Sequence, residues 1–156
     1  NAIDRGYDCL KVKVGIDPEL DVARLAAVRE AVGKDVCIRI DANQAWTPKQ
    51  AVKILNKMQE LGLDIELVEQ PVSAHDFAGL KYVTDRSYVP VLADESVFSP
   101  QDALTIMQMG AADLVNIKLM KCGGLYEAKK IHKLDGNSFE LTKNAPAGVI
   151  VPRFAE

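Results

Sequence analysis

Two kinds of segment alternate along the chain, and each has its own spacing of apolar residues. Short runs rich in Val, Ile and Leu occupy residues 9–15, 36–42, 65–69, 89–94 and 113–119. Longer stretches between them carry apolar residues three and four positions apart, which is the spacing of one face of an α-helix. Strands that alternate with helices of this length predict βαβ units and a parallel sheet.

The predicted helices have clear start and stop signals. Three begin with a capping side chain followed by proline, at Asp17-Pro18, Thr47-Pro48 and Ser99-Pro100. Each of the three ends near a glycine that can adopt the left-handed conformation, at Gly33, Gly62 and Gly110. Two further helices are predicted, one after Asp76 and one over residues 126–134.

One ionisable residue stands near the end of each predicted strand: Lys13, Asp41, Glu69, Asp94 and Lys118. Consecutive members are 24 to 28 residues apart, which corresponds to one strand and one helix per step. A doubly wound sheet would bring some of these groups together, whereas a (β/α)8 barrel brings all of them to its central mouth. No GxGxxG or phosphate-loop motif favours the doubly wound sheet, so we expect a TIM-type (β/α)8 barrel.

The pattern covers only part of such a barrel. Five strands do not close an eight-stranded barrel, which typically needs roughly 250 residues, and the chain has 156. After about residue 134 the alternation stops, and the tail holds a single apolar run at 149–151. We therefore expect a partial barrel domain over residues 1–134 and a divergent tail over 135–156. On length alone, the chain resembles a piece of a larger protein.

Three of the five groups are carboxylates and form an all-oxygen set. Asp41, Glu69 and Asp94 suit Mg²⁺, with Mn²⁺ as an alternative, because these ions prefer hard oxygen ligands and keep positions for water or substrate. No His or Cys lies beside them in the sequence, which argues against zinc. Strand alternation puts Lys11 and Lys13 on one face, so we expect them to point toward the carboxylates and balance their charge.

The lysines add acid–base chemistry to this set. A partly desolvated lysine near other cations has a lowered pKa and can act as a base at neutral pH. A metal bound to a substrate carboxylate stabilises the enolate that forms when the α-proton leaves. Lys13 and Lys118, on opposite faces of that carbon, could remove the proton from one side and return it to the other. This 1,1-proton transfer is the reaction of a racemase or an epimerase.

Composition narrows the class of protein without changing this picture. Charged residues make up 26% and hydrophobic residues 48% of the chain, as in soluble globular proteins. The net charge of −3 implies no basic surface for nucleic acid, and no apolar run approaches a membrane span. The three cysteines lie far apart, so we expect buried reduced thiols in a cytoplasmic protein, rather than a disulfide or a metal cluster.

Five stretches resemble one known family: KVKVG, RIDANQAW, ELVEQPV, LADES and VNIKLMKCGG. In this order and spacing they resemble the enolase superfamily, and within it the mandelate racemase/muconate-lactonizing-enzyme subgroup. The dipeptide epimerases of the L-Ala-D/L-Glu type are the most similar members, over about residues 3–133. The resemblance implies a Mg²⁺-dependent isomerase whose substrate is a small-molecule carboxylate, most simply a dipeptide.

The resemblance also implies a role for each matching residue. It makes Asp41, Glu69 and Asp94 the metal ligands. It makes Lys13, the second lysine of the KxK motif, and Lys118 the two acid–base residues.

Residues beside this set receive supporting roles. The resemblance implies that Lys11 helps to neutralise the substrate carboxylate or tunes the neighbouring base. Asn43 and Asn116 are expected to support the ligands and lysines by hydrogen bonds. Arg39 is expected to be a structural counter-ion. Lys121 falls on the predicted loop beyond the last strand and receives no catalytic role.

The chain also departs from the family pattern. The α+β capping domain, one early barrel strand and the last two strands have no counterpart in it, and no Asp-x-Asp motif follows Lys118. Sister reactions are therefore alternatives: muconate-type cycloisomerisation, o-succinylbenzoate synthesis and N-acylamino acid racemisation. Another alternative is an inactive truncated barrel, whose exposed strand edges would favour association into a homo-oligomer. A plain metal-binding module is a further alternative.

Overall fold

The computed structural model describes residues 3–134 and 149–152. Its strands are β1 (Cys9–Lys13), β2 (Cys37–Asp41), β3 (Ile65–Glu69), β4 (Val91–Ala93), β5 (Leu114–Ile117) and β6 (Val149–Pro152). Its helices are the short 3-10 turn η1 (Ile3–Arg5), then α1 (Pro18–Val32), α2 (Pro48–Glu60), α3 (Phe77–Thr84), α4 (Pro100–Met109), α5 (Leu119–Cys122) and α6 (Leu125–Lys133). Strands and helices alternate from β1 to β5, which confirms the predicted βαβ pattern.

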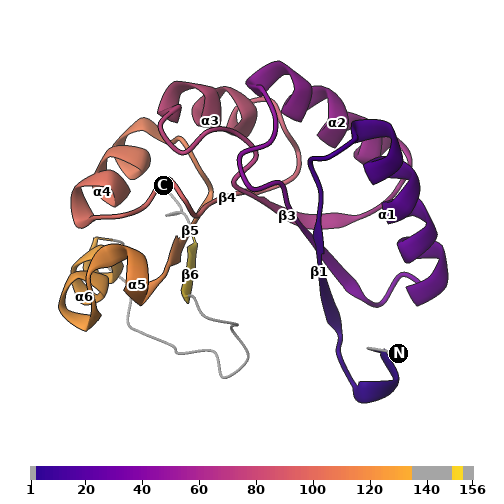
Figure 1. Cartoon of the computed structure of the whole chain (residues 1–156), viewed down its shortest axis with the longest axis horizontal. Coiled ribbons are helices and arrows are strands. Elements are labelled where there is room, and N and C mark those ends of the chain that lie inside the picture. Colours follow the sequence, from indigo (N-terminus) through magenta and orange to yellow (C-terminus); the bar gives the residue numbers. More distant parts are fainter. Residues whose placement is uncertain (1–2, 135–148, 153–156) are drawn as a thin grey trace.

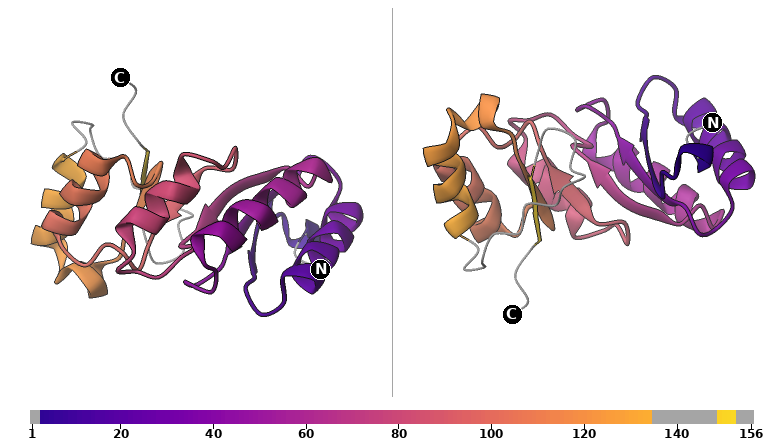
Figure 2. Two further views of the ribbon diagram at one scale, coloured as in Figure 1. Left: turned by 90° about the horizontal axis from the view of Figure 1, so that it is seen from above. Right: turned by 90° about the horizontal axis from the view of Figure 1, so that it is seen from below.

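The strands form one sheet in the order β1-β2-β3-β4-β5-β6, so that each strand pairs with the next along the chain. The first five strands are parallel, and β6 lies antiparallel beside β5. Figure 1 shows α1 to α4 in an arc along one side of the curved sheet, with α5 and α6 at the end of that arc. The views from above and below show the same row of helices along the strands (Figure 2).

The structure corrects the end of the fifth predicted strand and gives a partner to the apolar run in the tail. The run 113–119 does not continue as a strand, because the chain leaves β5 at Ile117 and turns into the short helix α5. The apolar run at 149–151 forms β6, whose partner is β5. Residues 135–148 and 153–156 lie outside the described part, so the division of the chain at residue 134 stays a prediction.

The predicted helix starts have the expected caps. The Asp17 carboxylate accepts hydrogen bonds from two backbone N–H groups of the first turn of α1. Thr47 forms a capping box with Gln50 at the start of α2, and Ser99 caps α4. These bonds satisfy N–H groups that have no partner inside the helix. Within the described part of the chain, no helix combines the length and the apolar character that a membrane crossing needs.

The apolar core lies between the sheet and the helices, on the side that we call the outer face. Ile38 and Ile40 of β2 and Val68 of β3 point to this side and are fully buried. Leu25 of α1 and Leu55 of α2 are equally buried in the same cluster. Alternate residues of each strand point to the opposite side, the inner face, because side chains alternate along a strand.

The cysteine prediction needs correction. All three thiols are free, as predicted, but only Cys122 is buried. Cys9 and Cys37 are half-buried and are register partners on β1 and β2, with their sulfur atoms 3.3 Å apart. The two thiols are therefore neighbours in space, although they are distant in sequence.

Candidate active site

The carboxyl ends of the parallel strands gather the five ionisable residues that the sequence singles out. Lys13, Asp41 and Glu69 end β1, β2 and β3, and they stand in register with one another. Asp94 and Lys118 directly follow the last residues of β4 and β5. The lysine–carboxylate cluster at this edge of the inner face consists of Lys11, Lys13, Asp41, Glu69, Asp94 and Lys118.

The carboxylates at the centre of this cluster are removed from water. Asp41 is 1% exposed, Glu69 3% and Asp94 1%. The Lys13 Nζ atom lies 2.7 Å from Oδ2 of Asp41, and the Lys11 Nζ atom lies 3.0 Å from the same oxygen. Lys11 also donates to Glu69. A buried carboxylate is costly unless it is paired, and these ion pairs provide the partners.

Lys118 closes the cluster from the other end of the row of strands. Its amine donates to Asp94 and lies 3.9 Å from Oε1 of Glu69. The Lys13 side chain is 66% exposed and that of Lys118 is 28% exposed. The two lysines therefore flank the carboxylates from opposite ends, and both remain accessible to a small molecule.

The pKa values of the three carboxyl groups diverge. Burial alone would raise the pKa of Asp41, but hydrogen bonds from Lys13 and Lys11 outweigh it and hold that pKa below its ordinary value. Burial raises the pKa of Glu69, and the adjacent Asp94 raises it further. Burial opposes the charge of Asp94, yet contacts with Glu69 and two lysines leave its pKa below the ordinary value. The pKa values of the neighbouring Glu69 and Asp94 are therefore shifted in opposite directions.

Lys118 and Lys11 have pKa values above the ordinary value of a lysine, whereas the sequence predicts a lowered pKa for a base. Burial would lower the pKa of Lys118, but its hydrogen bond to Asp94 outweighs burial and raises it. Burial likewise opposes the charge of Lys11, and its bonds to Glu69 and Asp41 raise its pKa. The predicted lowered pKa is therefore wrong for Lys118 in this arrangement. The reason is that the contacts of its amine with Asp94 and Glu69 outweigh both burial and the nearby charge of Lys11.

The donor set of the cluster fits a hard divalent cation. Asp41, Glu69 and Asp94 supply only oxygen atoms, from three adjacent strands, in a buried location. Each of the three carboxylates is paired with a lysine ammonium group, so the site attracts positive charge. A cation held by these oxygens would compete with Lys11 and Lys118 for the same partners.

The two asparagines contact this cluster directly. Asn43 accepts a hydrogen bond from the Lys13 amine through its Oδ1 atom, and its Nδ2 atom donates to Glu95 at 2.7 Å. Asn116 is 7% exposed, and its Nδ2 atom lies 3.4 Å from Oε1 of Glu69. Both therefore stand where they can orient a lysine or a carboxylate.

Residues 1–135 match the family described as enolase C-terminal domain-like. The chain belongs to this family.

Curated members of the enolase C-terminal domain-like family show the same likeness. The L-Ala-D/L-Glu epimerase of Clostridium acetobutylicum is 56% identical over 131 residues, which cover 84% of this chain and 37% of that protein. The hydrophobic dipeptide epimerase of Enterococcus faecalis is 54% identical over 129 residues, covering 83% and 36%. The N-succinyl-L-Arg/Lys racemase of Bacillus cereus is 43% identical over 130 residues, covering 83% and 35%. The chain thus spans little more than a third of the length of these relatives.

Solved structures confirm the fold. The Enterococcus faecalis dipeptide epimerase, complexed with Mg and the dipeptide L-Leu-L-Tyr, gives a TM-score of 0.82 at 52% identity, over 86% of this chain and 37% of that one. A substrate-liganded complex of the Bacillus subtilis L-Ala-D/L-Glu epimerase gives a TM-score of 0.84 at 50% identity, over 86% and 38%. The five parallel strands, with their helices, therefore form a partial TIM-type (β/α)8 barrel of the enolase superfamily, as predicted.

Lys121 is a site residue that the sequence reading missed. Its amine donates to both the side chain and the backbone carbonyl of Asp94, and its side chain is only 10% exposed. The sequence predicts a loop at this position, but Lys121 lies on α5, one helical turn after Lys118. Two lysines three residues apart in KLMK were the available signal, since that spacing puts both on one side of a helix.

Gln70 is a second missed residue, and it positions the backbone around Asp94. Its side chain is fully buried, and its Oε1 atom accepts from the N–H groups of Asp94 at 2.9 Å and Ser96 at 3.1 Å. Its Nε2 atom donates to the carbonyl of Val72 and to the hydroxyl of Ser96. Its backbone has a φ of 39°, uncommon for a side chain other than glycine. The sequence signal that could have identified Gln70 is its position directly after Glu69.

Arg39 is a counter-ion, but its partner lies on another strand. Its Nε atom donates to Glu66 of β3, away from the carboxylate cluster. The β2–β3 pairing shifts register between Ile38 and Arg39. Glu66 is left without a partner residue in β2, which lets its side chain reach Arg39.

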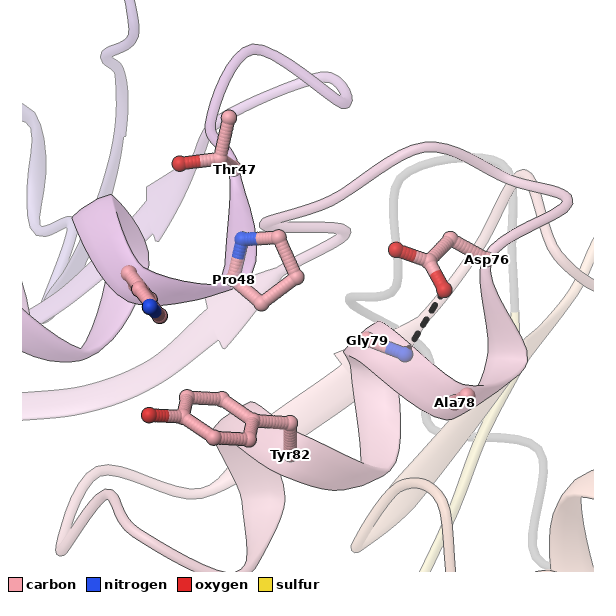
Figure 3. Close-up of a pocket in the computed structure, with 7 residues that line it drawn as sticks. Thr47, Pro48, Asp76, Ala78, Gly79 and Tyr82 are labelled. Carbon is pink, nitrogen blue, oxygen red and sulfur yellow. Dashed lines mark hydrogen bonds between the residues drawn. The ribbon is translucent and has the colours of Figure 1, made fainter.

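An open hollow of about 460 Å³ lies on the helical layer, between the starts of α2 and α3. Thr47, Pro48, Asp76 and Tyr82 are among its lining residues (Figure 3). The Asp76 carboxylate is occupied by its capping bond to the N–H group of Gly79. None of the lining residues belongs to the lysine–carboxylate cluster, so the hollow adds nothing to the chemistry of that site.

Proposed function

We propose that this chain carries the metal-binding and acid–base residues of a dipeptide epimerase, which removes and returns the proton next to a carboxylate. The observation that carries the proposal is that Lys13 and Lys118 flank three buried carboxylates at one edge of the sheet. The names of relatives at 56% and 54% identity support a dipeptide as the substrate class. Because the chain spans about 37% of such a relative, the activity of the chain itself is part of the proposal.

Asp41, Glu69 and Asp94 would hold Mg²⁺, or Mn²⁺ in its place. Solved relatives complexed with Mg and a dipeptide support the choice of ion. When bound, the ion supplies positive charge that stabilises the negative charge developing on the substrate carboxylate. The three carboxylates would release Lys11 and Lys118 in exchange for it. The two amines would thereby lose the contacts that raise their pKa.

Lys13 and Lys118 would transfer the proton on opposite faces of the α-carbon. The neutral amine of one lysine takes the proton, and the ammonium group of the other returns a proton to the opposite face. Asn43 accepts from the Lys13 amine and would aim it, while Asn116 would hold Glu69 in place. Lys11, between Asp41 and Glu69, would balance the charge of the substrate carboxylate.

Exchange of the α-proton in heavy water tests this proposal. L-Ala-L-Glu is incubated with the chain and Mg²⁺, and both loss of the α-proton signal and appearance of the second epimer are followed by NMR. Lys13→Met and Lys118→Met should each slow epimerisation by about 10² to 10⁴, the usual contribution of general acid–base catalysis. One of the two variants should still exchange the proton without inversion, because the remaining lysine works on its own face.

The control and the contrary outcomes separate the alternatives. Lys53→Met changes an exposed lysine of α2 and should leave the exchange rate unchanged. Exchange that persists in both site variants would contradict the assigned roles. If Mg²⁺ raises the midpoint of thermal unfolding but no exchange occurs, the chain binds the metal without turnover. If neither occurs, the chain is an inactive barrel fragment.

Racemisation of an N-acylated amino acid is the second candidate function. The 43% identity to the N-succinyl-L-Arg/Lys racemase of Bacillus cereus favours it. The same lysines and carboxylates serve both reactions, which differ in the group attached to the substrate nitrogen. N-succinyl-L-arginine and L-Ala-L-Glu are therefore offered to the chain separately, and the faster α-proton exchange identifies the substrate class.

A further inference from the structure

A second cluster of side chains lies at the opposite ends of β1 and β2. Cys9 and Cys37 are register partners four residues before Lys13 and Asp41. At about 3.3 Å per residue, the two clusters are roughly 13 Å apart along the strands. This second cluster, the thiol cluster, consists of Cys9, Cys37 and Glu66.

The ligand atoms of the thiol cluster already converge. The two sulfur atoms are 3.3 Å apart, and the Cys37 sulfur lies 2.9 Å from Oε2 of Glu66. One ligand atom from each of the three residues lies within 4.8 Å of the other two. The shifted register of β3 turns Glu66 toward the thiols, and Arg39 donates to its carboxylate and holds it there.

We propose that Cys9, Cys37 and Glu66 form a binding site for a thiophilic divalent cation of the Zn²⁺ type, separate from the lysine–carboxylate cluster. Thiolate sulfur favours zinc and its heavier analogue cadmium, whereas the all-oxygen cluster favours Mg²⁺. The cation forms two metal–sulfur bonds and one metal–oxygen bond. Both thiol protons leave to the solvent.

The geometry requires only small movements. Tetrahedral zinc with metal–sulfur bonds of about 2.3 Å places two sulfur atoms about 3.8 Å apart, and a carboxylate oxygen about 3.6 Å from each. The observed 3.3 Å and 2.9 Å therefore open by well under one ångström, a shift that side-chain rotation can supply. Both cysteines are half-buried and the Glu66 side chain is 46% exposed, so an ion has access and a water can complete the coordination.

The same two sulfur atoms could instead form a disulfide on oxidation. Adjacent strands bring Cα atoms to about 4.8 Å, which is within the range of a disulfide. A disulfide between the two cysteines would not involve the Glu66 carboxylate beside the Cys37 thiol, nor the Arg39 side chain that holds this carboxylate. The three-residue arrangement therefore favours a metal.

Cadmium titration tests the site on the reduced chain. Cd²⁺ is added in the presence of a phosphine reductant and excess Mg²⁺, and the ultraviolet thiolate-to-cadmium charge-transfer band is recorded. Only sulfur ligands produce this band, so binding at the carboxylates does not contribute. The unmutated chain should show the band with one ion per chain. Cys9→Ser and Cys37→Ser should each weaken binding by about tenfold or more, and Glu66→Gln by a similar factor.

Cys122→Ser is the matched control, because Cys122 is buried elsewhere, after β5. It should bind Cd²⁺ as the unmutated chain does.

Thiol titration is a second measurement that needs no variant. In the unmutated chain, Zn²⁺ should protect both Cys9 and Cys37 from a thiol reagent. An absent band, or a band that survives Cys37→Ser, overturns the proposal. So does a disulfide that forms in air while the reduced chain gives no band. The cadmium band and the thiol protection do not depend on dipeptide exchange, so this metal site and the proposed function can fail separately.

Discussion

Strand β2 presents two opposite chemistries on its two faces. On the outer face, Ile38 and Ile40 are fully buried against the helices. On the inner face, Asp41 pairs with the lysines of β1, and Arg39 pairs with Glu66 of β3. Apolar burial stabilises the fold by roughly 25 cal/mol per Å². Buried ion pairs, by contrast, recover only part of the cost of removing charge from water.

The difference shows that stability and chemistry are assigned to different sides of the same strands. A sheet selected for stability alone would carry apolar residues on both faces. The charged inner face therefore supports the proposal that this side of the sheet serves binding or catalysis. Substitutions on the two faces should then change different observables.

The largest expected effect is on the outer face. Ile40→Ala deletes a fully buried side chain and should lower the free energy of unfolding by about 2 to 5 kcal/mol, through lost burial and the cavity left behind. Urea denaturation followed by circular dichroism measures this change. Ile16→Ala is the matched control, because Ile16 is 94% exposed and should change stability by less than about 0.5 kcal/mol. Similar losses in both variants would contradict the assignment of the core to the outer face.

A smaller effect of a different kind is expected on the inner face. Lys11→Met removes an ammonium group that shares Asp41 and Glu69 with any bound cation. Because the Lys11 side chain is 38% exposed, solvent limits the effect to roughly 1 kcal/mol, or about fivefold tighter Mg²⁺ binding. The Mg²⁺-induced rise in the unfolding midpoint should therefore exceed that of the unmutated chain. Lys34→Met, at an exposed position, should leave the rise unchanged. A smaller rise in Lys11→Met would indicate that Lys11 supports the cation instead of competing with it.

The smallest expected effect is on how the free energy of unfolding changes at acidic pH. The pKa of Asp41 is held below its ordinary value of 3.8, because its hydrogen bonds from Lys13 and Lys11 outweigh burial. The unfolded chain then binds more protons than the folded chain, so the stability from Asp41 is present above 3.8 and is lost as pH falls through the folded pKa. Glu69, with a raised pKa, contributes in the opposite direction. The free energy of unfolding should thus fall less steeply with acid in Asp41→Asn, and an unchanged slope would rule out this pairing.

Short-range signals in the sequence were sufficient to predict most of the helices and strands. Capping residues with proline and terminal glycines act within a few residues of a helix end, so they can be read without knowing the tertiary structure. The regular spacing of Lys13, Asp41 and Glu69 predicted that they meet at one end of the strands, and the structure confirms this. The sequence pattern did not predict the helix α5, because α5 is one turn long and directly follows an apolar strand.

The parts that the sequence did not predict depend on contacts between distant segments. The direction of the Lys118 pKa depends on which group meets its amine, and that group is 24 residues away. The Cys9–Cys37 pair had a usable signal that was overlooked. Its separation of 28 residues equals that of Lys13 and Asp41, so the same strand register brings both pairs together.

The strand order has a consequence for how the chain folds. From β1 to β5, every strand pairs with its predecessor, so each pairing closes a loop of only one helix and its turns. The entropy cost of loop closure is then similar at every step, and structure can spread from one pair to the next as in a repeat protein. During synthesis, the carboxylates and lysines would accordingly meet in the order in which they leave the ribosome. Lys13 and Asp41 would meet first, and Lys118 would complete the set.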